Sequence, residues 1–206
     1  MNNALLSDPL VRVESVSKHF GDGPTRVDAL RNVTIDIFPR QIVALLGPSG
    51  SGKTTLLNVI GCILEPSSGR ITLDGDLVYD NRWLRSDLRR LRLDKIGFIF
   101  QSFNLITNMT AEANVSFPLR FSGIKKKKRQ ERAEELMVRV GLGDRIGHKP
   151  TELSGGQQQR VAVARALIND PPMILADEPT GNLDSTSGLV IMNMLDELRK
   201  SGKTLL

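Results

Sequence analysis

A glycine-rich segment near residue 50 has the residue types and spacing that bind phosphate groups. It matches the pattern G-x-x-x-x-G-K-[ST] and consists of Gly47, Pro48, Ser49, Gly50, Ser51, Gly52, Lys53 and Thr54. Glycines let backbone N–H groups surround phosphate oxygens, Lys53 places a positive charge on the β- and γ-phosphates, and Thr54 offers a hydroxyl to Mg²⁺. The alternative is an ordinary glycine-rich turn between a strand and a helix. Because an apolar run precedes the motif and a helix follows it, we interpret it as a P-loop that binds a nucleotide. We count Thr55, the next residue, among the nucleotide-binding residues.

Two carboxylates follow a short apolar run over residues 173–176. Asp177, at the end of this predicted strand, can hold Mg²⁺ through water. Successive strand residues point to opposite sides, so Glu178 is free to face the γ-phosphate and to orient or deprotonate the attacking water. Alone, the pair is equally compatible with two solvated acids. Together with the P-loop, it predicts the catalytic edge of a site that hydrolyses a nucleotide.

A third motif, Leu153-Ser154-Gly155-Gly156-Gln157, combines a helix start with two glycines. Ser154 and Gln157 have the S-x-x-Q spacing of a capping box, which by itself explains a helix N-terminus. Gly155 and Gly156 then lie in the first turn, where each glycine costs a helix about 1 kcal/mol relative to alanine. We take this cost to indicate a surface where something approaches the backbone closely, and an anion suits the positive end of a helix.

Together, these motifs resemble the ATP-binding subunits of ABC transporters, in which Leu-Ser-Gly-Gly-Gln is the signature motif. The resemblance runs from about residue 11 to residue 206. Gln101, after Ile-Gly-Phe-Ile-Phe, is similar to the Q-loop glutamine, which in the family reaches Mg²⁺ and links the core to a helical subdomain. Residues 181–184, Gly-Asn-Leu-Asp, resemble the D-loop. Phe20 matches the aromatic residue that stacks on adenine, and phenylalanine keeps the ring face of the more usual tyrosine.

The resemblance implies a site shared by two such subunits or domains packed head to tail. ATP would lie between the P-loop of one copy and the signature motif of the other, contacting Ser154, Gly155, Gly156 and Gln157. ATP closes the dimer and hydrolysis opens it. The implied catalytic residues are Lys53, Gln101 and Glu178, and the implied Mg²⁺ ligands are Thr54, Gln101 and Asp177.

The resemblance also implies a membrane partner. A permease in the membrane would convert the motion of the ATPase pair into work, docking near the Q-loop and the helical subdomain. The subunit would then be cytoplasmic and peripheral on the inner face of the cell membrane. No nucleic-acid partner is expected, because the basic stretches lack the interleaved aromatic residues of a single-strand binder.

Three segments narrow the resemblance to one group of these ATPases. They are Leu-Leu-Asn-Val-Ile-Gly at 56–61, Phe-Asn-Leu-Ile at 103–106 and Pro-Thr-Gly-Asn-Leu-Asp at 179–184, and they are similar to the lipoprotein-release and macrolide-export group. The ATPase of the bacterial cell-division apparatus belongs to the same group. The first hypothesis is therefore an ATPase subunit that powers such a transporter. The alternative is a module that dimerises on ATP but barely hydrolyses it. Soluble relatives acting on ribosomes or DNA usually carry tandem domains or long insertions, which this sequence lacks.

Alternating strands and helices must position these motifs. Short apolar runs at 41–46, 96–100 and 173–176 are typical of buried strands in a parallel sheet, whereas alternation around residues 11–13 and 33–37 indicates half-exposed strands. The pattern predicts an α/β fold: a three-layer P-loop NTPase core with an N-terminal antiparallel β subdomain and an inserted α-helical subdomain. We expect one domain over 1–206, with core and β subdomain at 1–101 and 169–206 and the helical subdomain at 102–168.

Composition supports a globular protein. The 206 residues are 40% hydrophobic and 25% charged, which excludes general disorder, and the net charge is +5. Cys62 is the single cysteine, so no internal disulfide forms. The N-terminus lacks the positive region and apolar run of a signal peptide, and no stretch approaches the roughly 20 apolar residues of a spanning helix.

The histidines bear on catalysis. Members of the resembled family carry a switch histidine on the strand after the D-loop helix, where it contacts the γ-phosphate. Here that strand begins near Lys203 and the sequence ends at Leu206, while the two histidines are His19 and His148. We therefore expect a C-terminally truncated member that binds ATP but hydrolyses it weakly, with an incompletely covered sheet edge.

Two basic stretches have no motif. Lys125, Lys126, Lys127, Lys128 and Arg129 form a run at the start of a predicted helix, and five arginines lie between residues 82 and 92. Charge runs are most often solvated surface. The alternative for residues 125–129 is contact with anionic lipid headgroups near a transporter.

Overall fold

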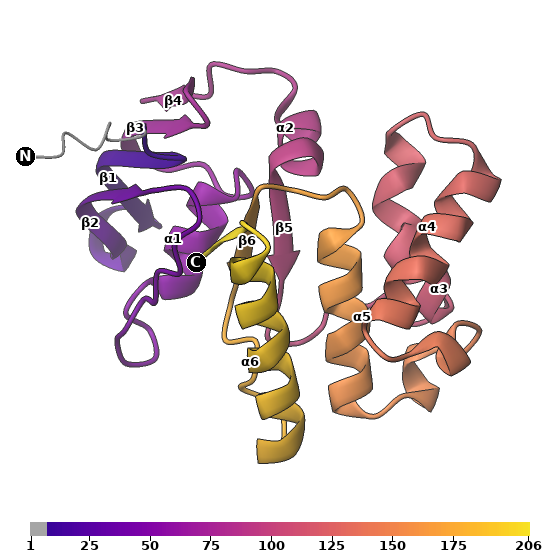
Figure 1. Cartoon of the computed structure of the whole chain (residues 1–206). Coiled ribbons are helices and arrows are strands. Elements are labelled where there is room, and N and C mark those ends of the chain that lie inside the picture. Colours follow the sequence, from indigo (N-terminus) through magenta and orange to yellow (C-terminus); the bar gives the residue numbers. More distant parts are fainter. Residues whose placement is uncertain (1–7) are drawn as a thin grey trace, which may run out of the picture.

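The N-terminal part of the molecule is an antiparallel sheet of four strands in the order β2-β1-β3-β4 (Figure 1). The computed structural model describes residues 8–206. The strands are β1 Val11–Phe20, β2 Val27–Ile37, β3 Ser68–Leu73 and β4 Asp76–Asp80, with the 3₁₀ turn η1 Gly23–Thr25 between the first two. Asp74 and Gly75 connect β3 to β4 at positive φ angles of 50° and 81°, which suit a tight hairpin.

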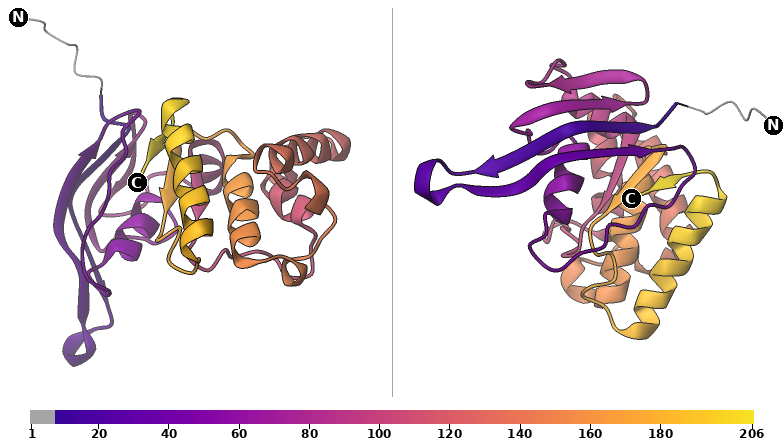
Figure 2. Two further views of the ribbon diagram at one scale, coloured as in Figure 1. Left: turned by 60° about the horizontal axis from the view of Figure 1, so that its bottom comes forward. Right: turned by 90° about the vertical axis from the view of Figure 1, so that its left-hand side faces the viewer.

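A second, parallel sheet has the order β5-β6-β7, formed by Ile96–Ile99, Met173–Ala176 and Thr204–Leu205. Side chains of neighbouring β6 residues pack on opposite faces of this sheet, in two different hydrophobic cores. Leu175 packs with helix α1, Lys53–Ile60, in the core beneath the antiparallel sheet, whereas Ile174 packs against α5, Gly155–Leu167, and α6, Ser185–Lys200. Helix α1 therefore lies between the two sheets, and α5 and α6 cover the other face of the parallel sheet (Figure 2). The predicted α/β fold is confirmed.

The apolar run at 41–46 is not the buried strand that we expected. A single parallel bridge joins Ile42 to Leu205, where Val43 N donates to Leu205 O and Leu205 N donates to Gln41 O, both at 2.9 Å. The segment has no further bridge within residues 8–206. Leu46 is 93% exposed. The segment instead lines an open groove of about 450 Å³ that it shares with β7 and α6.

The helices after β5 form a largely separate body on the far side of α5 (Figure 1). They are α3 Ala111–Ser116 and α4 Lys126–Arg139, with the 3₁₀ turns η2 Phe117–Phe121, η3 Gly143–Arg145 and η4 Pro150–Glu152. Buried side chains such as Leu119 and Met137 pack with Val161 of α5 in a core of their own. Across residues 8–206, no helix combines the length and apolar character that crossing a bilayer would need.

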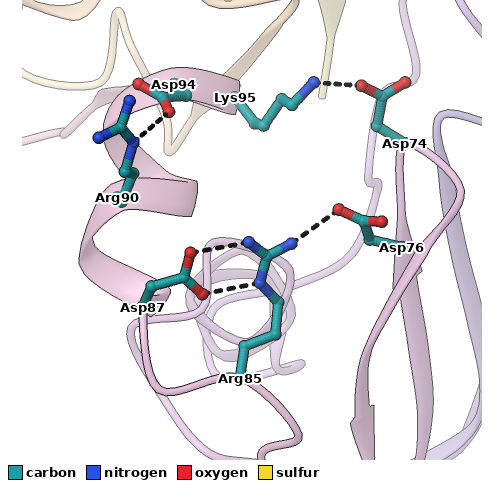
Figure 3. Close-up of polar contacts among 7 residues, drawn as sticks. All are labelled: Asp74, Asp76, Arg85, Asp87, Arg90, Asp94 and Lys95. Carbon is teal, nitrogen blue, oxygen red and sulfur yellow. Dashed lines mark hydrogen bonds and ion pairs between the residues drawn. The ribbon is translucent and has the colours of Figure 1, made fainter.

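Helix α2, Leu88–Lys95, leads into β5 and is tied to the antiparallel sheet by ion pairs (Figure 3). The Arg85 guanidinium donates to Asp87 at 2.8 Å and to Asp76 at 2.7 Å, and Lys95 pairs with Asp74. The hydrogen bond from Arg85 lowers the pKa of the Asp87 carboxyl from its ordinary value. Several charges of the 82–95 stretch are thus balanced by nearby aspartates.

The segment between β5 and α3 depends on a buried amide. Asn114 is 1% exposed. Its Oδ1 accepts from Ile106 N at 2.7 Å, and its Nδ2 donates to the carbonyls of Ile106, Met109 and Thr110 at 3.0, 3.3 and 3.0 Å. One side chain therefore satisfies four backbone groups around a turn that has no regular structure.

We expect Asn114→Ala to lower the free energy of unfolding by about 2–3 kcal/mol, because buried backbone groups lose their partners. Urea denaturation of wild type and variant measures this difference. The exposed Asn108 is the matched control, and Asn108→Ala should shift stability by no more than about 0.5 kcal/mol. Equal stability of wild type and Asn114→Ala would contradict the assignment.

Candidate active site

The P-loop backbone adopts conformations that only glycine takes without strain. Gly52 caps α1 at φ 92°, and a Cβ atom there would lie 2.4 Å from the carbonyl oxygen of Ala29. Gly50 also has a positive φ, 80°. The turn therefore needs glycine for its geometry, and it delivers Lys53 and Thr54 at the N-terminal end of α1, as the motif predicted.

The Lys53 ammonium lies inside the turn. Its Nζ donates to the carbonyl oxygens of Gly47 and Pro48 at 2.9 and 3.1 Å, and it lies 3.7 Å from Glu178 Oε1. The Lys53 side chain is 19% exposed. A positive charge thus sits between the P-loop carbonyls and a carboxylate, close to both.

Thr54 and Asp177 meet although 123 residues separate them. The Thr54 hydroxyl lies 3.0 and 2.9 Å from the two carboxylate oxygens of Asp177. These are hard oxygen donors of the kind that Mg²⁺ prefers. Within residues 8–206, no three His, Cys, Asp or Glu side chains gather into a metal site. The pair therefore fits Mg²⁺ that draws its remaining ligands from phosphate and water.

Glu178 is turned toward the P-loop by a strained backbone. Its φ is 44°, in the left-handed region, and it follows β6 by two residues. Gln101 Nε2 donates to Glu178 Oε2 at 3.2 Å, while Glu178 Oε1 faces Lys53. Backbone strain of this kind, where the surroundings maintain it, clusters at functional sites. We expected the alternation of side chains along a strand to turn Glu178 toward the phosphates. Its orientation comes instead from this backbone turn after β6.

The D-loop segment holds the Q-loop from the other side. Asn182 Nδ2 donates to the Gln101 carbonyl at 3.0 Å. A Cβ atom at Gly181 would lie 3.0 Å from Gln101 Nε2, so a larger residue would press on the glutamine. Asp184 caps α6 by accepting from Ser187 N at 2.9 Å, and this hydrogen bonding lowers the pKa of the Asp184 carboxyl.

The signature residues line a separate cavity. Ser154 and Gln157 form the capping box: Gln157 N donates to Ser154 Oγ at 3.3 Å and Ser154 N donates to Gln157 Oε1 at 2.8 Å. A Cβ atom at Gly156 would lie 2.6 Å from Ser187 Oγ, so this glycine has a packing reason within the chain. With α6 these residues border a cavity of about 150 Å³, apart from the groove that contains Lys53 and Glu178.

Phe20 is the last residue of β1. Its ring is 44% exposed, and Lys18 Nζ lies 5.1 Å from the ring centre. An exposed ring face of this kind is available for stacking against a flat heterocycle. Its role toward adenine stays a prediction.

Two residues of α5 that we did not assign from the sequence support the site. Gln159 is completely buried and its Nε2 donates to the Pro179 carbonyl at 2.7 Å, directly after Glu178. Arg165 donates to the carbonyls of Phe103 and Asn104 at 2.7 and 2.5 Å, just after Gln101. Burial lowers the pKa of Arg165 to about 10. Polar side chains on the buried face of an apolar helix are the signal that could have found both residues.

The chain matches the ABC transporter family over residues 30–181. An ABC transporter ATP-binding protein of Thermotoga maritima is 47% identical over 196 residues, which are 95% of this chain and 83% of that protein. The macrolide export ATP-binding/permease protein MacB of Vibrio parahaemolyticus is 48% identical over 98% of this chain, which spans 30% of that protein. A solved dimeric ATP-binding cassette, MJ0796 in a post-hydrolysis state bound to ADP and Pi, superposes with a TM-score of 0.86 at 44% identity, over 95% of this chain and 85% of that one.

We expect Arg165→Ala to loosen the turn after Gln101, because the carbonyls of Phe103 and Asn104 lose a charged donor. Amide hydrogen exchange at residues 101–104 should accelerate by about tenfold or more. Arg160 offers a matched control, since it donates in the same way to the carbonyls of Val140 and Gly141 at 3.1 and 3.3 Å. Arg160→Ala should accelerate exchange near those residues instead. Unchanged exchange at 101–104 in Arg165→Ala would contradict the assignment.

Proposed function

Since this chain belongs to the family of ABC transporter ATP-binding domains, we propose that it hydrolyses ATP and thereby drives a transporter of the lipoprotein-release or macrolide-export type. The single observation that carries the proposal is the meeting of Lys53, Gln101 and Glu178 at the P-loop. It joins a phosphate-binding cation to a carboxylate that can act on water. The permease-bearing MacB relatives support the type of transporter.

Lys53 supplies charge to the bound nucleotide. Its ammonium now donates to the carbonyls of Gly47 and Pro48. Phosphate oxygens are stronger acceptors than neutral carbonyls because they are charged, so ATP would take over these hydrogen bonds. The backbone N–H groups of the loop and the start of α1 would hold the remaining phosphate oxygens.

Glu178 acts on the attacking water. Its carboxylate is held between Lys53 and Gln101, and the side chain is 49% exposed, so water can reach it. Glu178 would accept a proton from that water as it attacks the γ-phosphate. Gln101 positions the carboxylate, and the Asn182 contact positions Gln101.

Thr54 and Asp177 would hold Mg²⁺, one through its hydroxyl and the other through its carboxylate or a water. When bound, Mg²⁺ neutralises charge that builds up on the β- and γ-phosphate oxygens. The protein's own part is to keep the two oxygen donors at the foot of α1 and the end of β6.

A second copy would complete the site. Ser154, Gly156 and Gln157 line a cavity separate from the P-loop groove, so one chain does not bring its own signature motif to its own phosphates. We propose a head-to-tail pair that closes on ATP and opens after hydrolysis. The solved cassette MJ0796 is itself dimeric.

The permease would dock in a groove of about 290 Å³ between the core and the helical part. Aromatic side chains from both parts line it, namely Phe98, Phe100, Phe117 and Phe121, together with the guanidinium-bearing Arg89, Arg92 and Arg165. Because Phe100 directly precedes Gln101, a protein segment bound in this groove could shift the position of Gln101. This contact would hold the subunit at the inner face of the cell membrane.

The second candidate is a module that dimerises on ATP with little hydrolysis. His19 lies in β1 and His148 lies before η4, and neither of these two histidines lines the groove beside Glu178.

We expect Glu178→Gln to reduce steady-state phosphate release by at least about 100-fold, because the amide cannot accept the proton from water. ATP affinity and ATP-driven dimerisation should persist. Glu197→Gln, an exposed change on α6, is the matched control and should keep the wild-type rate. If wild type and Glu178→Gln release phosphate equally slowly while both dimerise on ATP, the low-hydrolysis module is correct and the ATPase proposal is wrong.

For Lys53→Ala we expect ATP affinity to fall by about 10- to 100-fold, which corresponds to the loss of one charge-assisted hydrogen bond. Titration with a fluorescent ATP analogue measures the dissociation constant. The exposed Lys149→Ala removes the same charge elsewhere and should bind normally. Unchanged affinity in Lys53→Ala would remove the basis of the P-loop assignment.

If a permease docks in this groove, we expect Phe117→Ala to weaken the association between the chain and the permease, because the change removes an aromatic ring from the groove. The measurement is recovery of an integral membrane protein with the purified chain from detergent-solubilised membranes, with identification by mass spectrometry. Val138→Ala, at a 63% exposed position on α4, should not change the recovery. Equal recovery with both variants would place the permease contact elsewhere.

A further inference from the structure

A dense positive surface lies at the beginning of α4. From residue 113 to residue 130 the chain contains no acidic residue, and its six basic residues are Arg120, Lys125, Lys126, Lys127, Lys128 and Arg129. Lys125 to Lys128 and Arg120 are all exposed. We call these five exposed residues the basic ridge.

Few carboxylates of the described residues 8–206 balance the positive charges of the basic ridge. Among residues 8–206, its one ion pair joins Lys127 to Glu131 at 4.0 Å, and the Lys127 side chain is 91% exposed. The neighbouring stretch on and before α2 is different: Arg85, Arg90 and Lys95 pair with aspartates there (Figure 3). Two of the five arginines between residues 82 and 92, Arg85 and Arg90, are thus balanced by carboxylates. The basic ridge is a denser charge cluster, because its four lysines are consecutive and only Lys127 has an ion pair among residues 8–206.

The basic ridge does not stabilise its own helix. Lys125 is the N-cap of α4 and makes no side-chain capping bond, and the first turn has no acidic residue. Positive charges at the positive end of a helix are unfavourable. Because each Cα–Cβ bond of a helix leans toward its N-terminus and lysine side chains are long and flexible, the exposed lysines of the first turn can reach the space in front of α4. A flat anionic surface facing that end could contact all of them.

The position of the basic ridge relates it to the proposed permease groove. Arg89 of α2 stacks on Phe121 with its guanidinium carbon 3.7 Å from the ring centre, so α2 and the end of η2 touch. Phe121 lines the groove, is 50% exposed and stands between Arg120 and the lysines in sequence. Figure 1 shows α2 and the turn leading into α4 at the same end of the molecule. A permease seated in the groove would bring the membrane surface to that end.

We propose that the basic ridge binds the anionic lipid headgroups of the membrane that holds the permease. The expectation that the basic ridge faces the membrane rests on the proposed function, because it assumes a permease in the groove. The charge and exposure of the basic ridge do not depend on that function. Each basic residue near an anionic leaflet strengthens binding by about fivefold, so the four lysines form an effective attachment. An exposed ring beside the lysines suits the membrane interface, where aromatic residues gather. Single-stranded nucleic acid needs several stacking rings, and here Phe117 and Phe121 pack edge to face on each other.

The test uses the whole chain and vesicles without permease. We expect the wild-type chain to sediment with vesicles of equal parts phosphatidylglycerol and phosphatidylcholine at low salt. Binding should disappear at high salt, where the Debye length shortens, and with phosphatidylcholine alone. Combined Lys125→Gln, Lys126→Gln, Lys127→Gln and Lys128→Gln should weaken binding by at least about tenfold. Glutamine keeps the helix propensity of α4.

The matched control removes four charges from other exposed positions, by Arg31→Gln, Arg139→Gln, Lys149→Gln and Lys200→Gln. Both quadruple variants then carry the same net charge, 5 − 4 = +1. Binding that drops only in the lysine variant supports the proposal. Equal binding of the two variants, undiminished binding to phosphatidylcholine alone, or tighter binding to a single-stranded oligonucleotide than to the anionic vesicles would overturn it.

ATP binding, measured on the same samples, separates this proposal from the proposed function. Both variants should bind ATP as wild type does, because the basic ridge does not line the groove that contains Lys53. Loss of vesicle binding with intact ATP turnover would leave the ATPase proposal standing. If the wild-type chain binds the anionic vesicles but does not hydrolyse ATP, the lipid-binding proposal stands and the ATPase proposal is wrong.

Discussion

The rest of the site depends on one constraint: a cation and two carboxylates that are distant in sequence must be held together at one edge of the parallel sheet. Lys53 and Thr54 begin α1, whereas Asp177 and Glu178 follow β6. The contacts of 2.9 Å between Thr54 and Asp177 and 3.7 Å between Lys53 and Glu178 join the two halves. They are possible because α1 packs with Leu175 of β6, so that the start of the helix lies beside the carboxyl end of that strand. Ligands bind outside the carboxyl ends of the strands in open α/β sheets.

The polar contacts around that edge come from the helical side of the molecule. Helix α5 bonds to the Phe103 and Asn104 carbonyls through Arg165 and to the Pro179 carbonyl through Gln159. Asn182 adds a bond to the Gln101 carbonyl. The helix that carries the signature motif is thus bonded directly to the turns that carry Gln101 and Glu178. A movement of α5 would therefore displace both Gln101 and Glu178, and this is the physical link that the proposed coupling to a membrane partner would use.

Sequence reasoning worked where a motif sets local backbone geometry. The P-loop glycines, the capping box at Ser154 and the alternation of β1 could be predicted because each depends on residues close together in the chain. It failed for residues 41–46, since a strand also needs a neighbour, and the pairing of this segment within residues 8–206 is a single bridge from Ile42 to Leu205 of β7. It also missed the reason for Gly156, which is the Ser187 side chain of another helix, and the reach of Arg165 to carbonyls about 60 residues earlier. These depend on tertiary contacts that no local pattern encodes.

A crystal structure of the Glu178→Gln variant with ATP would show whether the P-loop and the end of β6 hold one nucleotide together. We expect Lys53 Nζ to leave the carbonyls of Gly47 and Pro48 for the β- and γ-phosphate oxygens, with Thr54 and Asp177 beside the same phosphates. It also predicts that Ser154 of the partner subunit faces the γ-phosphate. A nucleotide whose phosphates lie away from Lys53, or a γ-phosphate contacted by the signature motif of the same chain, would contradict it.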